Sequence, residues 1–194
     1  MDLEHLTSDL YRDYGVEDSK RLHLWFAPGE HPRIPDGLSD NTHYSETGAR
    51  IVAGLVADSI KRLELPLAQW LHTPDVVVAA DGSGDYRSLQ QAIYEAPWMD
   101  PGDGRRWHIR VKCGEYSERV YVQRERGNIL VRGDDPLRTI ITYGLHAKNE
   151  GSDGKLIGTF ATPTVTVDGD GMIWEDITIA NTAGPVAQAL ALRA

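Results

Sequence analysis

The chain has 194 residues, a formal net charge of −9, 41% hydrophobic residues and a single cysteine. This composition is sufficient for a buried core and excludes intrinsic disorder, and one cysteine excludes an internal disulfide framework. The sequence has no basic footprint typical of nucleic-acid binding and no apolar stretch long enough to span a membrane. We therefore expect neither nucleic acid nor a membrane as a partner, and the first residues also lack a signal-peptide pattern.

Residues 1–72 are predicted to be rich in α-helix. Apolar residues recur at helical spacing from Leu3 to Tyr14, and Gly15 follows as a helix C-cap. An apolar stripe with basic residues at its end predicts a second helix over about 46–63. A loop rich in proline, glycine and histidine, residues 26–43, separates the two helices, and no strand is expected in this part of the chain.

Asp40 and His43 stand three residues apart at the end of that loop. A carboxylate at this spacing can fix the tautomer of an imidazole, which then accepts a proton from a serine in a hydrolase triad. On spacing alone, a solvated loop is the better interpretation. The spacing still leaves two interpretations open, a hydrolase acid–base pair and a solvated loop.

The context of this pair resembles a known family. The segments D-L-x-x-L-T-x-D-L-Y, F-A-P-G-x-H and D-x-x-H, followed by an apolar helix, resemble the C-terminal end of the α/β GDSL/SGNH hydrolases of the rhamnogalacturonan acetylesterase type. By this resemblance Asp40 and His43 are the triad acid and base, and the family's nucleophilic serine and oxyanion donors lie upstream. We expect residues 1–72 to be a C-terminal remnant of such a domain, unable to catalyse by itself.

A boundary is predicted at Pro74, since the residue before a proline avoids the helical region. The β-branched run 75–80 predicts a strand, and a glycine-rich acidic loop follows at 81–85. A phosphate or calcium site there would need a basic clamp or EF-hand spacing, so a plain turn is the better interpretation. Ser88, with Gln91 three residues later, then predicts the start of a short helix that covers the open end of a solenoid.

Short strands follow at solenoid-like intervals, as in a parallel β-solenoid. We expect them at 108–112, 120–122, 128–132, 139–142, 164–167 and 173–180. The last is predicted as one alternating strand, with Ile173, Ile177 and Ile179 facing one way and Thr178 the other. The segment G-E-Y-S-E-R-V at 114–120 is interpreted as structural, with a glycine turn, a packed tyrosine and a glutamate available to pair.

Several ordered motifs in residues 73–194 resemble the pectin methylesterase (pectinesterase) family. They are D-G-S-G-D-Y, G-x-Y-x-E-x-V, the stretch from Gly169 to Pro185 containing D-I-T-I-A-N-T-A-G-P, and Q-A-L-A-L-R. The resemblance implies a mainly β, right-handed parallel β-helix, of which residues 73–194 are the N-terminal part. It also implies hydrolysis of pectin methyl esters, homogalacturonan as the polysaccharide partner, no metal or organic cofactor, and an extracellular or periplasmic location.

The same resemblance points to Gln188 and Thr159 as substrate-site residues. Gln188 matches the family's glutamine in Q-A-V-A-L-R, whose amide N–H stabilises the oxyanion formed on the ester carbonyl. Thr159 lies in a long polar loop, 143–162, and by resemblance borders the substrate groove, while a structural role for it stays open. The family histidine that precedes the glutamine is missing here, and the turn is one residue shorter.

The family's two catalytic aspartates, its second glutamine and its arginine all follow the Q-A-L-A-L-R motif. We therefore expect the chain to be part of a carbohydrate esterase and to be inactive alone. Two alternatives are an acetylesterase activity of the N-terminal part and a non-catalytic, polysaccharide-binding β-solenoid.

Overall fold

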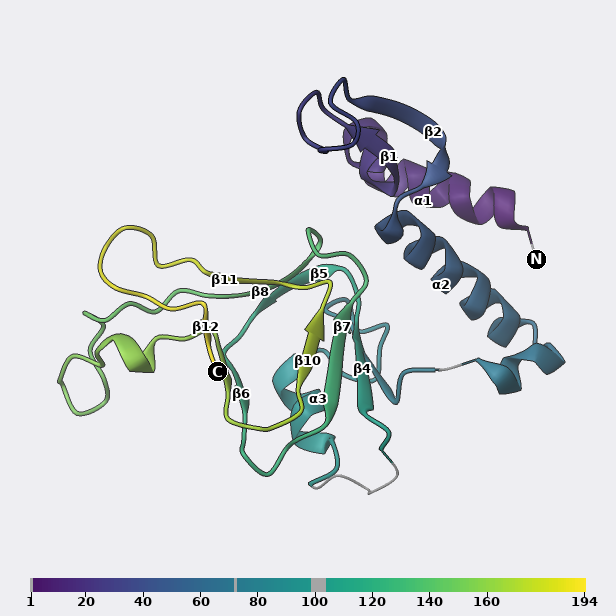
Figure 1. The fold of residues 1–194 in the computed structure, drawn as a ribbon. Coiled ribbons are helices and arrows are strands. Elements are labelled where there is room, and N and C mark those ends of the chain that lie inside the picture. The colour runs from purple at the N-terminus through teal and green to yellow at the C-terminus, as the bar shows by residue number, and fades with distance from the viewer. Residues whose placement is uncertain (1, 72, 99–103) are drawn as a thin grey trace. The chain divides into compact units, whose positions relative to one another are not determined.

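The computed structural model describes residues 2–71, 73–98 and 104–194. The chain divides into two compact units, Met1–His72 and Thr73–Ala194, which Figure 1 shows as ribbons. None of the helices in these described ranges is both long and apolar enough to cross a membrane.

The first unit combines helices with one β-hairpin. Its elements are α1 (Leu3–Asp18), the 3-10 helix η1 (Ser19–Leu22), β1 (His23–Phe26), β2 (Leu38–Tyr44), α2 (Glu46–Arg62) and the 3-10 helix η2 (Pro66–Trp70). The Asp2 carboxylate caps α1 by accepting a hydrogen bond from the His5 backbone N–H, and the Ser45 hydroxyl caps α2 in the same way. Gly15, at φ 72°, interrupts the regular turns of α1 where the sequence predicts the helix to end.

The prediction that this unit has no strand was wrong. Strands β1 and β2 pair in antiparallel orientation, with Trp25 opposite Ser39 and Phe26 opposite Leu38. The His23 ring stacks on that of Tyr44, with the ring centroids 5.0 Å apart. Cross-strand aromatic contacts of this kind, rather than alternation of apolar and polar residues, stabilise the hairpin, and sequence periodicity therefore missed it.

The second unit is a parallel β-helix, as predicted. Its elements are β3 (Val76–Val78), α3 (Leu89–Glu95), β4 (Trp107–Val111), β5 (Gly114–Ser117), β6 (Val120–Val122), β7 (Ile129–Gly133), β8 (Thr139–Tyr143), the 3-10 helix η3 (Thr159–Ala161), β9 (Val165–Val167), β10 (Ile173–Glu175), β11 (Thr178–Asn181) and β12 (Leu192–Arg193). They form three sheets, in the orders β3-β4-β7-β10, β5-β8-β11 and β6-β9-β12. Every strand pair in these sheets is parallel.

Two strand predictions need correction. The stretch 173–180 is not one strand, because Asp176 adopts a left-handed conformation (φ 54°) and turns the chain from β10 into β11, which belong to different sheets. Gly114, interpreted as a turn, is instead the first residue of β5. Both errors have one cause, since short strands separated by one or two turn residues leave too little periodicity to locate each corner.

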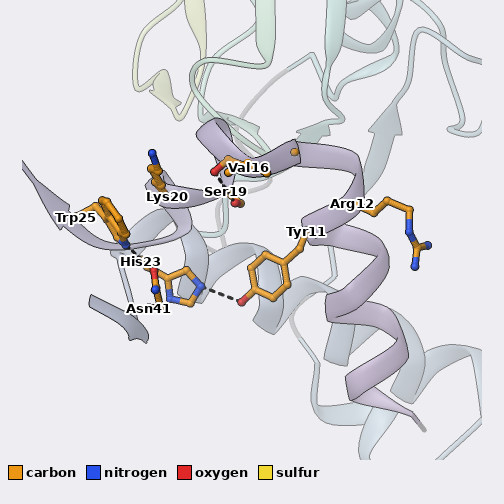
Figure 2. A pocket seen from close by; sticks show the side chains of 9 residues that line it. Tyr11, Arg12, Val16, Ser19, Lys20, His23, Trp25 and Asn41 are labelled. Atoms are coloured by element: carbon orange, nitrogen blue, oxygen red, sulfur yellow. Dashed lines mark hydrogen bonds between the residues drawn. The ribbon is translucent and has the colours of Figure 1, made fainter. Parts of the chain in front are cut away.

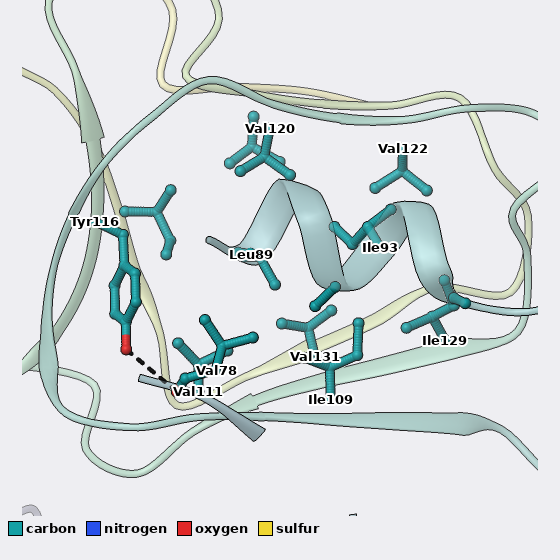
Figure 3. Close-up of a cluster of buried hydrophobic side chains, with 14 residues drawn as sticks. Val78, Leu89, Ile93, Ile109, Val111, Tyr116, Val120, Val122, Ile129 and Val131 are labelled. Carbon is teal, nitrogen blue, oxygen red and sulfur yellow. Dashed lines mark hydrogen bonds between the residues drawn. The ribbon is translucent and has the colours of Figure 1, made fainter. Parts of the chain in front are cut away.

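The core of the second unit is built from β-branched side chains that point inward from the strands. Nine aliphatic ones are at most 2% exposed: Val78, Ile109, Val111, Val120, Val122, Ile129, Val131, Ile141 and Val165. Figure 3 shows these side chains gathered around helix α3. The buried residues of α3 pack against β3 and β6, which are the first strands of their sheets, so the helix closes that end of the β-helix.

Glu118, which precedes β6, binds helix α3 to the first coil through hydrogen bonds. The carboxylate accepts hydrogen bonds from the Ser88 hydroxyl at 2.6 Å, the Leu89 N–H at 2.8 Å and the Gln90 N–H at 3.2 Å. The Gln90 side chain exchanges two further hydrogen bonds with the backbone of Tyr121. A carboxylate at a helix N-terminus satisfies otherwise unpaired N–H groups and the positive end of the helix dipole. The structural role predicted for Glu118 is therefore specific: it caps α3.

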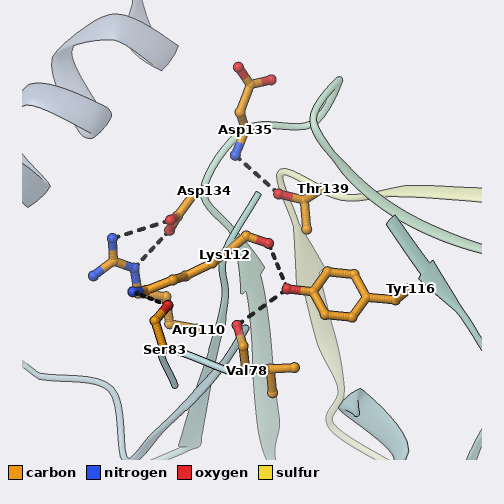
Figure 4. A network of polar contacts seen from close by, with 8 residues as sticks. All are labelled: Val78, Ser83, Arg110, Lys112, Tyr116, Asp134, Asp135 and Thr139. Carbon is orange, nitrogen blue, oxygen red and sulfur yellow. Dashed lines mark hydrogen bonds and ion pairs between the residues drawn. The ribbon is translucent and has the colours of Figure 1, made fainter. Parts of the chain in front are cut away.

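Polar contacts also join neighbouring segments of the second unit, as Figure 4 shows. Arg110 forms a forked ion pair with Asp134, with atoms 2.7 and 3.2 Å apart. The Tyr116 hydroxyl donates to the Lys112 carbonyl at 2.8 Å, and burial raises the pKa of Tyr116 to about 12. The loop 81–85 is a turn, and the described residues contain no group of three metal-ligating side chains.

Replacing Glu118 with alanine should lower the free energy of unfolding by about 1–3 kcal/mol, because two backbone N–H groups and one hydroxyl lose a charged acceptor. Urea denaturation measures this change. The control is Glu115→Ala on β5, whose exposed side chain makes a change within about 0.5 kcal/mol the expected result. Equal stabilities of the two variants would contradict the capping role.

Candidate functional site

The structure brings Gln188 and Thr159 into direct contact. Gln188 is exposed and lies in the irregular segment between β11 and β12, while Thr159 is the first residue of η3. The Thr159 hydroxyl donates a hydrogen bond to the Gln188 side-chain oxygen, with 2.9 Å between the oxygens, across 29 residues of sequence. The two residues selected independently by family resemblance are thus neighbours.

This hydrogen bond orients the Gln188 amide. A primary amide carries one carbonyl oxygen, which accepts, and one NH₂ group, which donates. Because the Thr159 hydroxyl occupies the oxygen, the NH₂ group is left to face away from Thr159 as a donor. An exposed, oriented N–H donor is the element that an oxyanion site requires.

The loop between β8 and η3 is folded rather than extended. An antiparallel bridge between Glu150 and Leu156 forms a small hairpin within it. The Ala147 N–H donates to the Gln188 backbone carbonyl at 2.8 Å, so the loop also supports the glutamine from the main chain. Phe160, which adjoins Thr159, is 77% exposed.

In the first unit, Asp40 and His43 form a hydrogen-bonded pair within β2 rather than at the end of a loop. The Asp40 Oδ2 lies 2.7 Å from His43 Nδ1, while its Oδ1 accepts from the backbone N–H groups of Thr42 and His43. These contacts, the His43 backbone N–H first, lower the pKa of Asp40 to about 2. With Nδ1 held by the carboxylate, the Nε2 atom of this largely exposed imidazole can accept a proton.

Ser45, two residues beyond His43, is not a candidate nucleophile. Its hydroxyl donates to the Arg21 carbonyl at 2.6 Å and accepts from the Gly48 N–H at 3.1 Å. The first contact joins Ser45 to η1, and the second caps α2. The Ser45 hydroxyl at the start of α2 therefore provides no nucleophile for the Asp40–His43 pair.

A pocket of about 670 Å³ lies between α1 and the hairpin of the first unit, as Figure 2 shows. The Tyr11 hydroxyl lies 2.9 Å from His23 Nε2, and the Trp25 indole N–H donates to the Asn41 side chain at 2.8 Å. Burial is the main cause that raises the pKa of Tyr11 to about 12. Asp40 and His43, the predicted acid and base of this unit, are not among the residues that line the pocket. The pocket therefore does not support their predicted roles.

Three parallel sheets wound in successive coils define the class of parallel β-helix proteins. The sequence model of the pectinesterase family matches residues 75–194. The chain therefore belongs to the pectinesterase family.

Individual relatives agree with this assignment. The chain is 45% identical over 122 residues to pectinesterase 3 of Citrus sinensis, covering 62% of this chain and 19% of that protein. The solved structure of pectin methylesterase from carrot is similar with a TM-score of 0.56 and 42% identity, over 63% of this chain and 36% of that chain.

A relative of another kind matches part of the chain. Rhamnogalacturonan acetylesterase RhgT of Bacillus subtilis is 56% identical over 71 residues, which are 37% of this chain and 31% of that protein. The chain thus spans between 19% and 36% of the length of these three relatives.

The contacts of Asp40 predict a carboxyl group that titrates near pH 2 in an NMR titration. His43→Ala should raise this pKa, because the imidazole hydrogen bond is lost. The pKa should stay below the ordinary value of about 3.9, because the two backbone N–H donors remain. His5→Ala, on the exposed face of α1, should leave the midpoint unchanged. A wild-type midpoint near the ordinary value would contradict the paired geometry.

Proposed function

We propose that residues 73–194 supply the oxyanion-binding glutamine and part of the substrate groove of an esterase that hydrolyses the methyl esters of pectin. Membership of the pectinesterase family supports the class of reaction. The observation that carries the proposal for the site is the hydrogen bond from Thr159 to Gln188. The polymeric partner is methyl-esterified homogalacturonan, and the proposed location, where this polymer occurs, is outside the cytoplasm.

The proposed role of Gln188 follows from the charge that develops during ester hydrolysis. When a nucleophile attacks the ester carbonyl, the carbonyl oxygen gains negative charge, and an N–H donor fixed beforehand stabilises it without reorganisation. Gln188 donates from Nε2, while Thr159 keeps the amide oxygen turned away from the oxyanion. Gln188 carries no ionisable group, so this role involves no proton transfer by the glutamine. By family resemblance, aspartates act as nucleophile and general acid/base.

The test is methanol release from methyl-esterified pectin by the complete gene product. Gln188→Ala should lower kcat by about 100- to 1,000-fold, the usual effect of losing one oxyanion donor, with a much smaller change in KM. Gln91→Ala, an exposed glutamine on α3, is the matched control and should keep the wild-type rate. Wild-type protein that binds pectin and releases no methanol would favour a polysaccharide-binding solenoid instead.

We also propose that the first unit contributes the acid and base of an acetylesterase. The Asp40–His43 geometry is the specific observation in favour, because carboxylate and imidazole already have the relation that serine hydrolases use. The similarity to a rhamnogalacturonan acetylesterase supports the same chemistry. The substrate class is then an O-acetylated pectic polysaccharide.

Acetate release from acetylated rhamnogalacturonan by the complete gene product tests this second activity. His43→Ala should lower acetate release by about four orders of magnitude, as loss of a triad function does, and should leave methanol release unchanged. His5→Ala serves as the control and should affect neither product. Undiminished acetate release by His43→Ala, or none from the wild type, would refute the proposal.

A further inference from the structure

Gln188 depends for its position on contacts with other loops, because no sheet holds it. The residue lies between β11, which ends at Asn181, and β12, which begins at Leu192. Groups that stabilise a transition state must be held within roughly 0.5 Å of the productive position. Hydrogen bonds from other loops must therefore supply the rigidity that a strand ladder supplies elsewhere.

The Asn181 side chain connects the loops around Gln188. Its amide nitrogen donates to three backbone carbonyls, those of Leu145 at 2.9 Å, Leu190 at 3.0 Å and Thr162 at 3.2 Å. Its amide oxygen accepts from the Ala183 N–H at 2.9 Å. The three carbonyls belong to the loop after β8, the segment just beyond Gln188, and the end of η3, so one side chain joins all three.

Thr162 completes the connection. Its side chain is fully buried, donates to the Thr159 carbonyl at 2.7 Å and accepts from the Leu190 N–H at 3.0 Å. The backbones of Thr159 and of the residue two positions beyond Gln188 are thus joined through one hydroxyl. Together with Asn181, this hydroxyl fixes the distance between the two chain segments that carry the Thr159–Gln188 contact.

We propose that Asn181 is a positioning residue for Gln188. It holds the backbone segments of Thr159 and Gln188 so that the glutamine amide is presented in one orientation, and it does not touch the substrate itself. This inference deepens the proposed methylesterase function and rests on it for its catalytic consequence. The geometric consequence, a fixed Thr159–Gln188 contact, is independent of any activity.

The side chain at position 181 must donate hydrogen bonds. All three partners of the Asn181 amide nitrogen are carbonyl oxygens, so only a side chain with hydrogen-bond donors satisfies them. Aspartate has nearly the same shape, but its carboxylate accepts hydrogen bonds and would face three acceptors without a donor. Asn181→Asp therefore removes the positioning contacts with little change in volume.

Asn149 offers a matched control in the loop after β8. Its side-chain oxygen accepts a hydrogen bond from the His146 N–H at 2.7 Å. A carboxylate accepts equally well, so Asn149→Asp makes the same chemical change while preserving this contact. The two variants differ in whether the asparagine acts as donor or as acceptor.

The first measurement uses the 194-residue chain and needs no activity. Nuclear Overhauser contacts between the side chains of Thr159 and Gln188, which a hydrogen bond joins, should be present in the wild type and in Asn149→Asp. They should be lost in Asn181→Asp, while the core resonances of β3 to β8 are retained. If Asn181→Asp does not fold, Asn181→Ala, which also lacks a donor, is measured in its place. Wild-type-like contacts in the folded Asn181 variant, or none in the wild type, would overturn the proposal.

The second measurement uses the complete gene product on methyl-esterified pectin. Asn181→Asp should lower kcat by about 10- to 100-fold with KM within about twofold, because a misplaced catalytic donor slows the chemical step more than it weakens binding. A change in KM alone would argue against positioning of Gln188. A wild-type protein without methanol release would refute the proposed function. The Overhauser contacts would then still test whether Asn181 positions Gln188 beside Thr159.

Discussion

The pairing of β11 with β8 is the interaction on which the candidate site depends. Asn181 lies opposite Tyr143 in this parallel ladder, and the ladder continues for one residue, where the Thr182 N–H donates to the Tyr143 carbonyl. The two segments that follow β8 and β11 then leave the sheet side by side. The loops that follow consequently start from adjacent points, and Leu145 and Asn181, 36 residues apart in sequence, come within hydrogen-bonding distance. A shift of register by one residue would turn the Asn181 side chain to the other face of the sheet.

Sequence reasoning predicted the parts of this fold that are decided locally. The Ser88 cap of α3 and the strand 120–122 depend on neighbouring residues, and the structure contains both. The corner at Asp176 and strand β5 were missed, because a left-handed residue and a strand that begins with glycine carry no periodic signal. The β1–β2 hairpin was missed because the rings that stabilise it meet only across the pair.

The two candidate sites differ in how much of their geometry could be predicted. Asp40 and His43 lie three residues apart, so local backbone geometry alone brings the carboxylate to the imidazole. Spacing left two interpretations of this pair open, and the resemblance of its context selected one. Family resemblance selected Thr159 and Gln188 one by one, but their contact spans 29 residues and exists only because the coils stack in register. Asn181 could not be singled out, since its partners lie 9, 19 and 36 residues away along the chain.

The capping of α3 by Glu118 has a consequence for synthesis on the ribosome. The helix and its carboxylate cap are separated by about 30 residues, and at roughly 5–20 residues per second the cap is synthesised about 2–6 s after the helix. During that interval the first N–H groups of α3 cannot be paired with Glu118. A helix of only seven residues is unstable in isolation. The end of the β-helix that is synthesised first therefore becomes ordered only when its first coil closes.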